Sequence, residues 1–248
     1  MYQFFVNPGQ IQGHLVTIEG TDVNHIKNVL RMKPGEEIAV SNGRDGREYR
    51  CAIEKLEEEQ IICRLLFMKE DGVELPARVY LFQGLPKADK MELIIQKAVE
   101  LGAFEIIPVE TKRAVVKLDA KKAAGKTARW NAIAQAAAKQ SKRRVIPTVT
   151  DCMNFKEAVD YAKEMELKLI PYELSEGMDE TRRQIESVRA GWNVAVFIGP
   201  EGGFTEEEIE LAREAGIVPV TLGKRILRTE TAGFTVLSWL MYRLEGQT

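Results

Sequence analysis

The sequence is poor in the residues on which metal centres, disulfide scaffolds and membrane anchors depend. It has three cysteines, widely spaced and without a Cys-x-x-Cys pair, and only two histidines. This argues against a disulfide frame, a structural zinc and a histidine-based metal site. No apolar run approaches the roughly 20 residues of a membrane-spanning helix. The N-terminal residues also lack the basic and apolar regions of a signal peptide. We therefore expect a cytoplasmic protein without metal or membrane contact.

Positive charge is concentrated in one part of the chain. Of 248 residues, 45% are hydrophobic and 29% charged, which is ordinary for a globular protein. Segment 111–144 holds eleven lysines and arginines and one acid, so it carries +10 while the rest of the chain carries −12. Such a run is usually a solvated helix face, but here the matching acids are missing. We interpret the segment as a surface that meets a polyanion, with nucleic acid as the leading candidate.

The pattern of apolar residues changes near residue 70. Before it, short β-type runs alternate with Pro-Gly, Asn-Gly and Asp-Gly turns, which predicts a small β-barrel interrupted by one helix. After it, strands alternate with helices, which predicts an α/β fold with a mainly parallel sheet covered on both faces. We therefore predict two domains, 1–70 and 71–248. Ligands of such sheets bind beyond the carboxyl ends of the strands, which places Glu173, Gly199 and Gly223 around one crevice.

A glycine loop at 199–203 is the first motif that indicates chemistry. In "VFIGPEGGFTEEEIELA" it joins a predicted strand to a helix that Thr205 and Glu208 would open as a capping box. The loop has neither a Walker lysine nor G-x-G-x-x-G spacing, so a phosphate cradle is poorly supported. The carboxylate of Glu201 would also repel phosphate. The loop fits a cationic nucleoside better, and S-adenosylmethionine, with its sulfonium and ammonium groups, is such a molecule.

A second motif, "LGKRILRTETAGF" at 222–234, follows the last predicted strand and opens the last helix. Together with the glycine loop it resembles the RsmE family of SPOUT (trefoil-knotted) methyltransferases, which methylate N3 of a uridine in 16S ribosomal RNA. The stretches "HIKNVLRMKPGEEI", "KADKMELIIQKAVELG" and "AAAKQSKRR" fall in the family's order, so the resemblance covers nearly the whole chain. One departure is Gln3, where the family often has arginine, and this weakens any claim for an RNA contact there.

The resemblance implies a PUA-like N-terminal barrel, a trefoil-knotted C-terminal domain, a homodimer, and 16S rRNA or the assembled small subunit as partner. It also implies S-adenosylmethionine as cofactor. With Glu201 added for the cationic group, the expected cofactor residues are Tyr172, Glu173, Gly199, Glu201, Gly202, Gly203, Leu222, Gly223, Ile226, Leu227 and Thr231. Core packing is the alternative interpretation of Leu222 and Leu227.

The chemistry of uridine methylation suggests two catalytic candidates. Arg228 would stabilise the uracil anion, and Glu230 would orient Arg228 or take the N3 proton. The alternative is a structural Arg–Glu pair that fixes the loop. Contacts to RNA phosphates are expected from Arg31, Lys112, Arg113, Lys142, Arg143 and Arg144.

Two other classes of function and one ambiguous helix remain open. The barrel and basic segment alone also fit a non-catalytic RNA-binding or ribosome-assembly protein, and the glycine loop alone fits a phosphate-handling nucleotide enzyme. The last helix carries apolar residues at helical spacing, which predicts core packing, or a dimer interface if the resemblance holds. These residues are Phe234, Leu237, Leu240, Met241 and Leu244.

Overall fold

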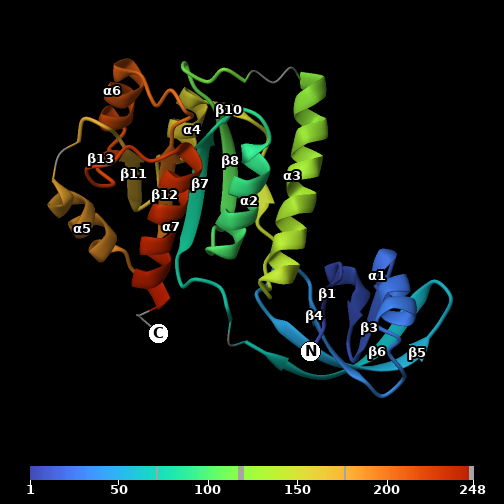
Figure 1. Cartoon of the computed structure of the whole chain (residues 1–248). Coiled ribbons are helices and arrows are strands. Elements are labelled where there is room, and N and C mark those ends of the chain that lie inside the picture. The colour runs from blue at the N-terminus through green and yellow to red at the C-terminus, as the bar shows by residue number, and fades with distance from the viewer. Residues whose placement is uncertain (71, 117–119, 176, 246–248) are drawn as a thin grey trace. The chain divides into compact units, whose positions relative to one another are not determined.

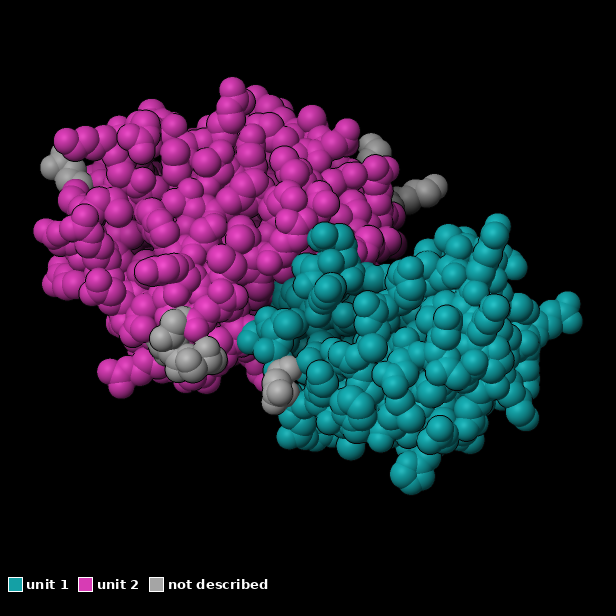
Figure 2. Space-filling view, turned by 60° about the horizontal axis from the view of Figure 1, so that its bottom comes forward, with its two compact units in different colours: residues 1–74, 138–146 teal, residues 75–137, 147–248 magenta. Residues whose placement is uncertain are grey.

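The computed structural model describes residues 1–70, 72–116, 120–175 and 177–245. The chain forms two compact units, which Figure 2 shows in different colours. Unit 1 contains residues 1–74 and 138–146, and unit 2 contains residues 75–137 and 147–248. The break after residue 74 lies close to the sequence-based boundary. Segment 138–146, in contrast, comes from the part of the chain that we had placed wholly in the second domain.

Unit 1 is a small β-domain with one helical insertion. Its single sheet is antiparallel except between β1 and β4. The helical insertion is α1 (Thr21–Asn24), continued by the π-helical turn η2 (His25–Val29). Fully buried Phe4, Ile26, Ile38 and Ile61 belong to its core, as the alternation of apolar residues predicts. The strand order is β1 (Gln3–Phe5), β4 (Glu37–Ser41), β5 (Glu48–Leu56), β6 (Gln60–Lys69), β3 (Leu15–Glu19) and β2 (Ile11–Gln12).

Unit 2 is built on a parallel sheet, which confirms the expected α/β class. Every strand pairing described in this sheet is parallel. The central strands β7 and β12 are almost wholly buried, because helices cover both faces. The strand order is β10 (Met153–Asn154), β8 (Glu105–Glu110), β7 (Arg78–Gly84), β12 (Asn193–Ile198), β11 (Leu167–Pro171) and β13 (Val218–Val220), with β9 (Thr148–Val149) also paired to β8.

The helices of unit 2 divide between the two faces of the sheet (Figure 1). On one face α7 (Thr229–Glu245) packs against α2 (Lys90–Glu100), α5 (Met178–Ser187) and strands β7 and β12. On the other face α4 (Phe155–Tyr161) and α6 (Glu206–Glu214) cover an aromatic core in which Phe82 and Phe197 stack at 4.3 Å between ring centroids. The remaining helix is α3 (Ala120–Gln140).

The last part of the chain returns from the edge of the sheet to its middle. β13 is the edge strand beside β11, yet the following helix α7 packs on the central strands β12 and β7. The connection 221–228 thereby comes to lie beside the glycine loop 199–203. This arrangement brings both sequence motifs to the carboxyl ends of the strands.

Candidate functional site: a pocket between two loops of unit 2

A pocket of about 530 Å³ lies where strands β11, β12 and β13 end. This volume is typical of a small-molecule site. The pocket collects residues from three loops that follow these strands, as expected for the ligand crevice of a parallel sheet. Ten of the eleven predicted cofactor residues line it, namely Tyr172, Glu173, Gly199, Glu201, Gly202, Gly203, Leu222, Gly223, Ile226 and Leu227. The eleventh, Thr231, lies exposed in the first turns of α7 and is not among the lining residues.

The glycine loop is packed too tightly for side chains at several points. A Cβ on Gly199 would lie 3.1 Å from the Cα of Gly203, and a Cβ on Gly84 would lie 2.6 Å from the Cδ of Pro200. Gly203 itself has a φ of 66°, in the left-handed region that favours glycine. The loop therefore presents its backbone closely to whatever occupies the pocket.

The helix after the loop begins with the predicted capping box. The Thr205 hydroxyl accepts a hydrogen bond from the N–H of Glu208 at 3.3 Å, and the Glu208 carboxylate accepts one from the N–H of Thr205 at 2.8 Å. Glu208 is buried and also accepts a hydrogen bond from the N–H of Lys112. The acids that follow the loop therefore serve the helix start, and they do not line the pocket.

A buried chain of hydrogen bonds joins the two motif loops. The hydroxyl of Thr229, at the start of α7, donates to the carbonyl oxygen of Gly199 at 2.6 Å. The same hydroxyl accepts from the side-chain amide of Gln83 at 2.9 Å, and that amide also donates to the carbonyl of Gly84. Gln83 is 0% exposed. The end of β7, the glycine loop and the start of α7 are thus held together at the pocket.

The two acidic side chains of the pocket differ in their surroundings. Glu201 accepts hydrogen bonds from the N–H of Lys87 at 3.2 Å and from the ammonium of Lys90 at 3.0 Å. Burial alone would raise the pKa of Glu201, but the backbone N–H groups and the Lys90 ammonium lower it below its usual value. Glu173 is exposed and has no hydrogen-bond or ion-pair partner in the described chain. Glu173 is therefore the carboxylate that is free to meet a cationic ligand.

Lys90 is a site residue that the sequence reasoning missed. It opens α2, lines the pocket and also lies 3.4 Å from the carboxylate of Glu230. Within the sequence it looked like one more surface charge of a helix start. Its two acidic partners stand more than a hundred positions further along the chain, so no local pattern indicated it.

Arg228 and Glu230 are not the pair that the sequence suggested. Arg228 is exposed and lines the pocket, and within the described residues its guanidinium makes no hydrogen bond or ion pair. The carboxylate of Glu230 lies 3.4 Å from the ammonium of Lys90, and Glu230 does not line the pocket. Among the described residues the carboxylate of Glu230 lies against the ammonium of Lys90, and no hydrogen bond or ion pair joins it to Arg228.

Two of the predicted RNA-binding residues are buried. Arg143 and Arg144 are 4% and 6% exposed and form ion pairs with Glu74 and Glu48. Glu74 also accepts hydrogen bonds from the backbone N–H groups of Arg144 and Val145. The prediction that these two arginines contact RNA phosphates is therefore corrected: their charge is used inside unit 1, where a buried guanidinium needs a carboxylate partner.

The other predicted RNA contacts are at the surface. Arg31 and Lys142 are exposed in unit 1, and both have a positive φ. Lys112 is exposed in unit 2 and forms an ion pair with Glu207, which raises the pKa of Lys112. The guanidinium of Arg113 donates to the carbonyl of Gly202 at 3.0 Å, so Arg113 lies against the glycine loop. Lys117 and Asp119 of the basic segment lie outside the described residues.

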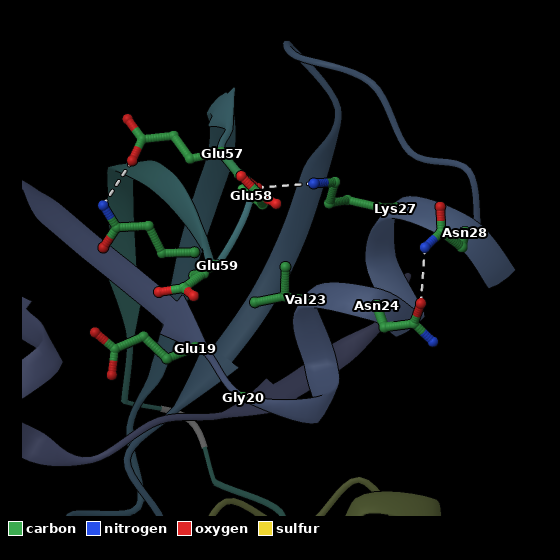
Figure 3. A pocket seen from close by; sticks show the side chains of 10 residues that line it. Glu19, Gly20, Val23, Asn24, Lys27, Asn28, Glu57, Glu58 and Glu59 are labelled. Carbon is green, nitrogen blue, oxygen red and sulfur yellow. Dashed lines mark hydrogen bonds between the residues drawn. The ribbon is translucent and has the colours of Figure 1, made fainter.

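Unit 1 contains a second hollow, of about 920 Å³, with a very different lining (Figure 3). Glu19, Glu57, Glu58 and Glu59 surround it, and its one lysine, Lys27, donates to the backbone carbonyl of Glu57 at 2.9 Å. So many carboxylates disfavour a nucleic-acid phosphate.

Metal and membrane features are not found in the part of the chain that the structure describes. It contains no group of three or more side chains suited to hold a metal ion. None of its helices combines the length and apolar character of a membrane span.

Comparison with known proteins assigns both units to one family. Residues 73–241 match the family model described as RNA methyltransferase domain, and residues 18–66 match the one described as RNA methyltransferase PUA domain. Ribosomal RNA small subunit methyltransferase E of Bacillus subtilis is 40% identical over 232 residues, which cover 92% of this chain and 90% of that protein. The protein of the same name from Mesomycoplasma hyopneumoniae is 34% identical, with 96% and 98% covered.

A solved structure agrees with this result. Ribosomal RNA small subunit methyltransferase E from Neisseria gonorrhoeae, bound to S-adenosyl methionine, superposes with a TM-score of 0.82 at 33% identity. The match covers 98% of this chain and 97% of that one. The fold, the two family domains and the full-length similarity agree. The chain belongs to the RNA methyltransferase family whose members include the ribosomal RNA small subunit methyltransferases E of these bacteria.

Proposed function

We propose that the protein transfers the methyl group of S-adenosylmethionine to N3 of a specific uridine in 16S ribosomal RNA. The observation that carries the proposal is the unit 2 pocket, in which the two motif loops lie side by side at the carboxyl ends of the strands. The S-adenosyl methionine bound in the Neisseria gonorrhoeae relative supports the same cofactor here. Ribosomal RNA is made and assembled in the cytoplasm, where we expect the protein to act.

The residues of the pocket fit this cofactor. Gly199, Gly203 and Gly223 leave the loop backbones open to close approach, which suits recognition of an adenine edge by N–H and C=O groups. The free carboxylate of Glu173 can meet the ammonium or the ribose hydroxyls. When bound, S-adenosylmethionine supplies an electrophilic methyl group attached to a sulfonium. No step requires a metal ion.

Arg228 is our candidate for the chemical step. The uracil N3–H lies on the pairing edge, so the base must be unpaired or extruded before it can enter the pocket. N3 must also lose its proton, and the resulting negative charge spreads onto the neighbouring uracil oxygens. The exposed guanidinium of Arg228 lines the pocket and has no acidic partner among the described residues, so it can donate hydrogen bonds to that anion.

The remaining surface cations are candidates for RNA docking. We propose phosphate contacts for Arg31, Lys112, Arg113 and Lys142, which would position the RNA without reading its sequence. Arg113 would serve both the RNA and the loop, since it already contacts Gly202. The substrate is the 16S rRNA, either free or within the assembled small subunit.

We also propose that the active form is a homodimer that uses α7. Leu237, Leu240 and Leu244 are at most 1% exposed, so these residues belong to the core of unit 2, as expected. On the same helix Tyr242 is 84% exposed, while Phe234 and Met241 are half-buried. Aromatic residues and methionine are enriched at protein interfaces, so Tyr242, Phe234 and Met241 support this proposal. Sedimentation equilibrium tests this: a monomer at micromolar concentration would contradict it.

Two measurements test the function itself. Calorimetry should show S-adenosylmethionine binding to the purified protein, and mass mapping of 16S rRNA should show one methylated uridine that is absent from cells lacking the protein. RNA binding without cofactor binding would favour a non-catalytic assembly protein. ATP that competes with S-adenosylmethionine would favour a phosphate-handling enzyme.

A further inference from the structure

Lys90 joins three segments that are distant in the sequence. It is the first residue of α2, and its ammonium lies 3.0 Å from the carboxylate of Glu201 in the glycine loop. The same ammonium lies 3.4 Å from the carboxylate of Glu230 in the first turn of α7. The side chains are 28%, 28% and 17% exposed, so the cluster is largely shielded from solvent.

The cluster depends on the lysine for its charge balance. Two carboxylates close to one another repel, and a single ammonium between them offsets that repulsion. One Glu230 oxygen has no solvent contact and no hydrogen-bond partner in the described chain, and the ammonium at 3.4 Å is what faces it. Without Lys90 this oxygen would be a buried charge without compensation, which is strongly unfavourable.

The partners of Lys90 are placed to control the shape of the pocket. Glu201 is followed by Gly202 and Gly203, which line the pocket. Glu230 follows Thr229, whose hydroxyl donates to the carbonyl of Gly199. A displacement of Glu201 or Glu230 therefore moves the backbone that faces the ligand.

We propose that Lys90 is a positioning residue that holds the glycine loop against the start of α7 through Glu201 and Glu230, and thereby sets the affinity for the cofactor. This inference rests on the proposed function of the pocket. It also gives Glu201 and Glu230 a role in ordering the pocket walls.

A role for Lys90 as the base is inconsistent with its surroundings. The hydrogen bond to Glu201 and the proximity of Glu230 raise the pKa of Lys90, so it stays protonated at neutral pH and cannot accept the N3 proton. The main competing role is a direct contact between the Lys90 ammonium and the cofactor, because Lys90 also lines the pocket.

A double-mutant cycle separates the two roles. Lys90→Met, Glu230→Gln and the double variant are compared with wild type for S-adenosylmethionine affinity by calorimetry, melting temperature, and single-turnover rate at saturating cofactor. Glu230 does not line the pocket, so a positioning role predicts that Glu230→Gln also weakens binding and that the double variant is no worse than Lys90→Met. We expect Lys90→Met to raise Kd about tenfold or more, which is about 1.4 kcal/mol. The rate at saturation should change little.

Two further variants serve as rescue and control. Lys90→Arg keeps the charge and should restore most of the affinity. Lys97→Met removes a lysine from the same helix whose ion pair with Glu100, at 2.8 Å, lies outside the pocket lining, and it should leave Kd unchanged.

Several results would overturn the inference. One is an unchanged Kd for S-adenosylmethionine in Lys90→Met. Another is a raised Kd in Lys90→Met together with an unchanged Kd in Glu230→Gln, because this combination indicates direct contact between Lys90 and the cofactor. A fall in melting temperature alone would show a purely structural role. If Lys90→Met does not fold, Glu230→Gln and Lys90→Arg still decide the question. Failure of wild type to bind the cofactor would instead contradict the proposed function.

Discussion

Single residues decide how closely the glycine loop approaches its ligand and its neighbours. Gly203 has a left-handed φ of 66°, and no atom lies within 4 Å of the Cβ that a larger residue would carry. A substitution there is resisted by backbone strain and not by a clash. At Gly199 the reverse holds, because a Cβ would lie 3.1 Å from Gly203 while the backbone is unstrained. The two glycines are required for different physical reasons.

Gly203→Val should therefore weaken cofactor binding while the protein stays folded. A β-branched residue in the left-handed region costs roughly 1–2 kcal/mol, which the loop would relieve by moving. We expect the Kd for S-adenosylmethionine to rise about tenfold or more, with an unchanged circular dichroism spectrum. Gly125→Val, in α3 with nothing within 4 Å of its Cβ, is the control. Wild-type affinity in Gly203→Val would contradict the assignment of this loop to the cofactor.

Arg228→Ala should separate chemistry from binding. The guanidinium lines the pocket without a carboxylate partner in the described structure, so its removal leaves no orphaned acid. If it stabilises the uracil anion, single-turnover methylation should fall on the order of a hundredfold or more. Cofactor and RNA affinities should change little. Arg189→Ala, an exposed arginine outside the pocket lining, is the matched control. A wild-type rate in Arg228→Ala would place the catalytic group elsewhere.

At the scale of helices and loops, the first residues of three helices position the pocket and its glycine loop. α6 begins with a capping box that satisfies its own N–H groups and leaves the preceding glycine loop free for a ligand. α7 begins with Thr229 and Glu230, whose side chains reach the glycine loop and Lys90. α2 begins with Lys90 itself. The start of each of these helices therefore orders the pocket or the loop that forms it.

Thr229→Val should loosen the start of α7 from the glycine loop. The Gly199 carbonyl would lose a donor and the buried Gln83 amide an acceptor, at about 1–3 kcal/mol for each group left unpaired. We expect the free energy of unfolding in urea to fall by about 2 kcal/mol or more, together with weaker cofactor binding.

Two substitutions in α7 control this experiment. Thr229→Ser keeps the hydroxyl and should restore both quantities. Thr235→Val removes a hydroxyl that, in the described structure, donates to the Thr231 carbonyl of the same helix, and it should have little effect. If Thr229→Val were as stable as wild type and bound cofactor equally well, the hydrogen-bond chain would not order the pocket.

At the scale of the whole molecule, the positive charges of the basic segment 111–144 divide into two groups: some form ion pairs inside unit 1, and others stay exposed. The basic segment 111–144 stands out in the sequence, but two of its arginines, Arg143 and Arg144, form buried ion pairs with Glu74 and Glu48 within unit 1. Lys142, between them and the helix end, stays exposed and without a side-chain partner in the described structure. Neighbouring cations in one sequence run can therefore have unrelated roles.

Lys142→Ala and Arg143→Ala should accordingly change different properties: the first should change RNA binding, and the second should change stability. Lys142→Ala should weaken RNA binding and flatten the log Kd against log salt plot by about 0.7–0.9, with an unchanged melting temperature. Arg143→Ala leaves Glu74 partly buried without its main ion pair and should destabilise unit 1 by about 3–5 kcal/mol. Filter binding across a salt series and urea unfolding measure the two quantities. An RNA defect in Arg143→Ala without loss of stability would contradict its structural role.

Local patterns were sufficient to predict much of this protein. The capping box at Thr205 and Glu208 depends on residues three positions apart, so it could be identified from the sequence. The alternation of strands and helices likewise predicted a parallel sheet, and the ends of its strands placed Glu173, Gly199 and Gly223 around one crevice, where all three line the pocket. Most of the other cofactor candidates were implied by the family resemblance. The fit of the glycine loop to a cationic nucleoside was inferred from its residue types, whereas the role of the last motif was implied by the resemblance to the RsmE family.

Long-range partners were decided only by the tertiary structure. Arg143 meets Glu74 across 69 positions, and Lys90 meets Glu201 across 111, and no local pattern encodes either pairing. Whether a charged side chain is buried, paired or free depends on which distant carboxylate the fold brings beside it, since charge is tolerated away from water only with a partner. For this reason the sequence determined which loops form the pocket. The tertiary structure determined which charged side chains hold those loops in place, which charged side chains remain free to bind a ligand, and which are buried in ion pairs.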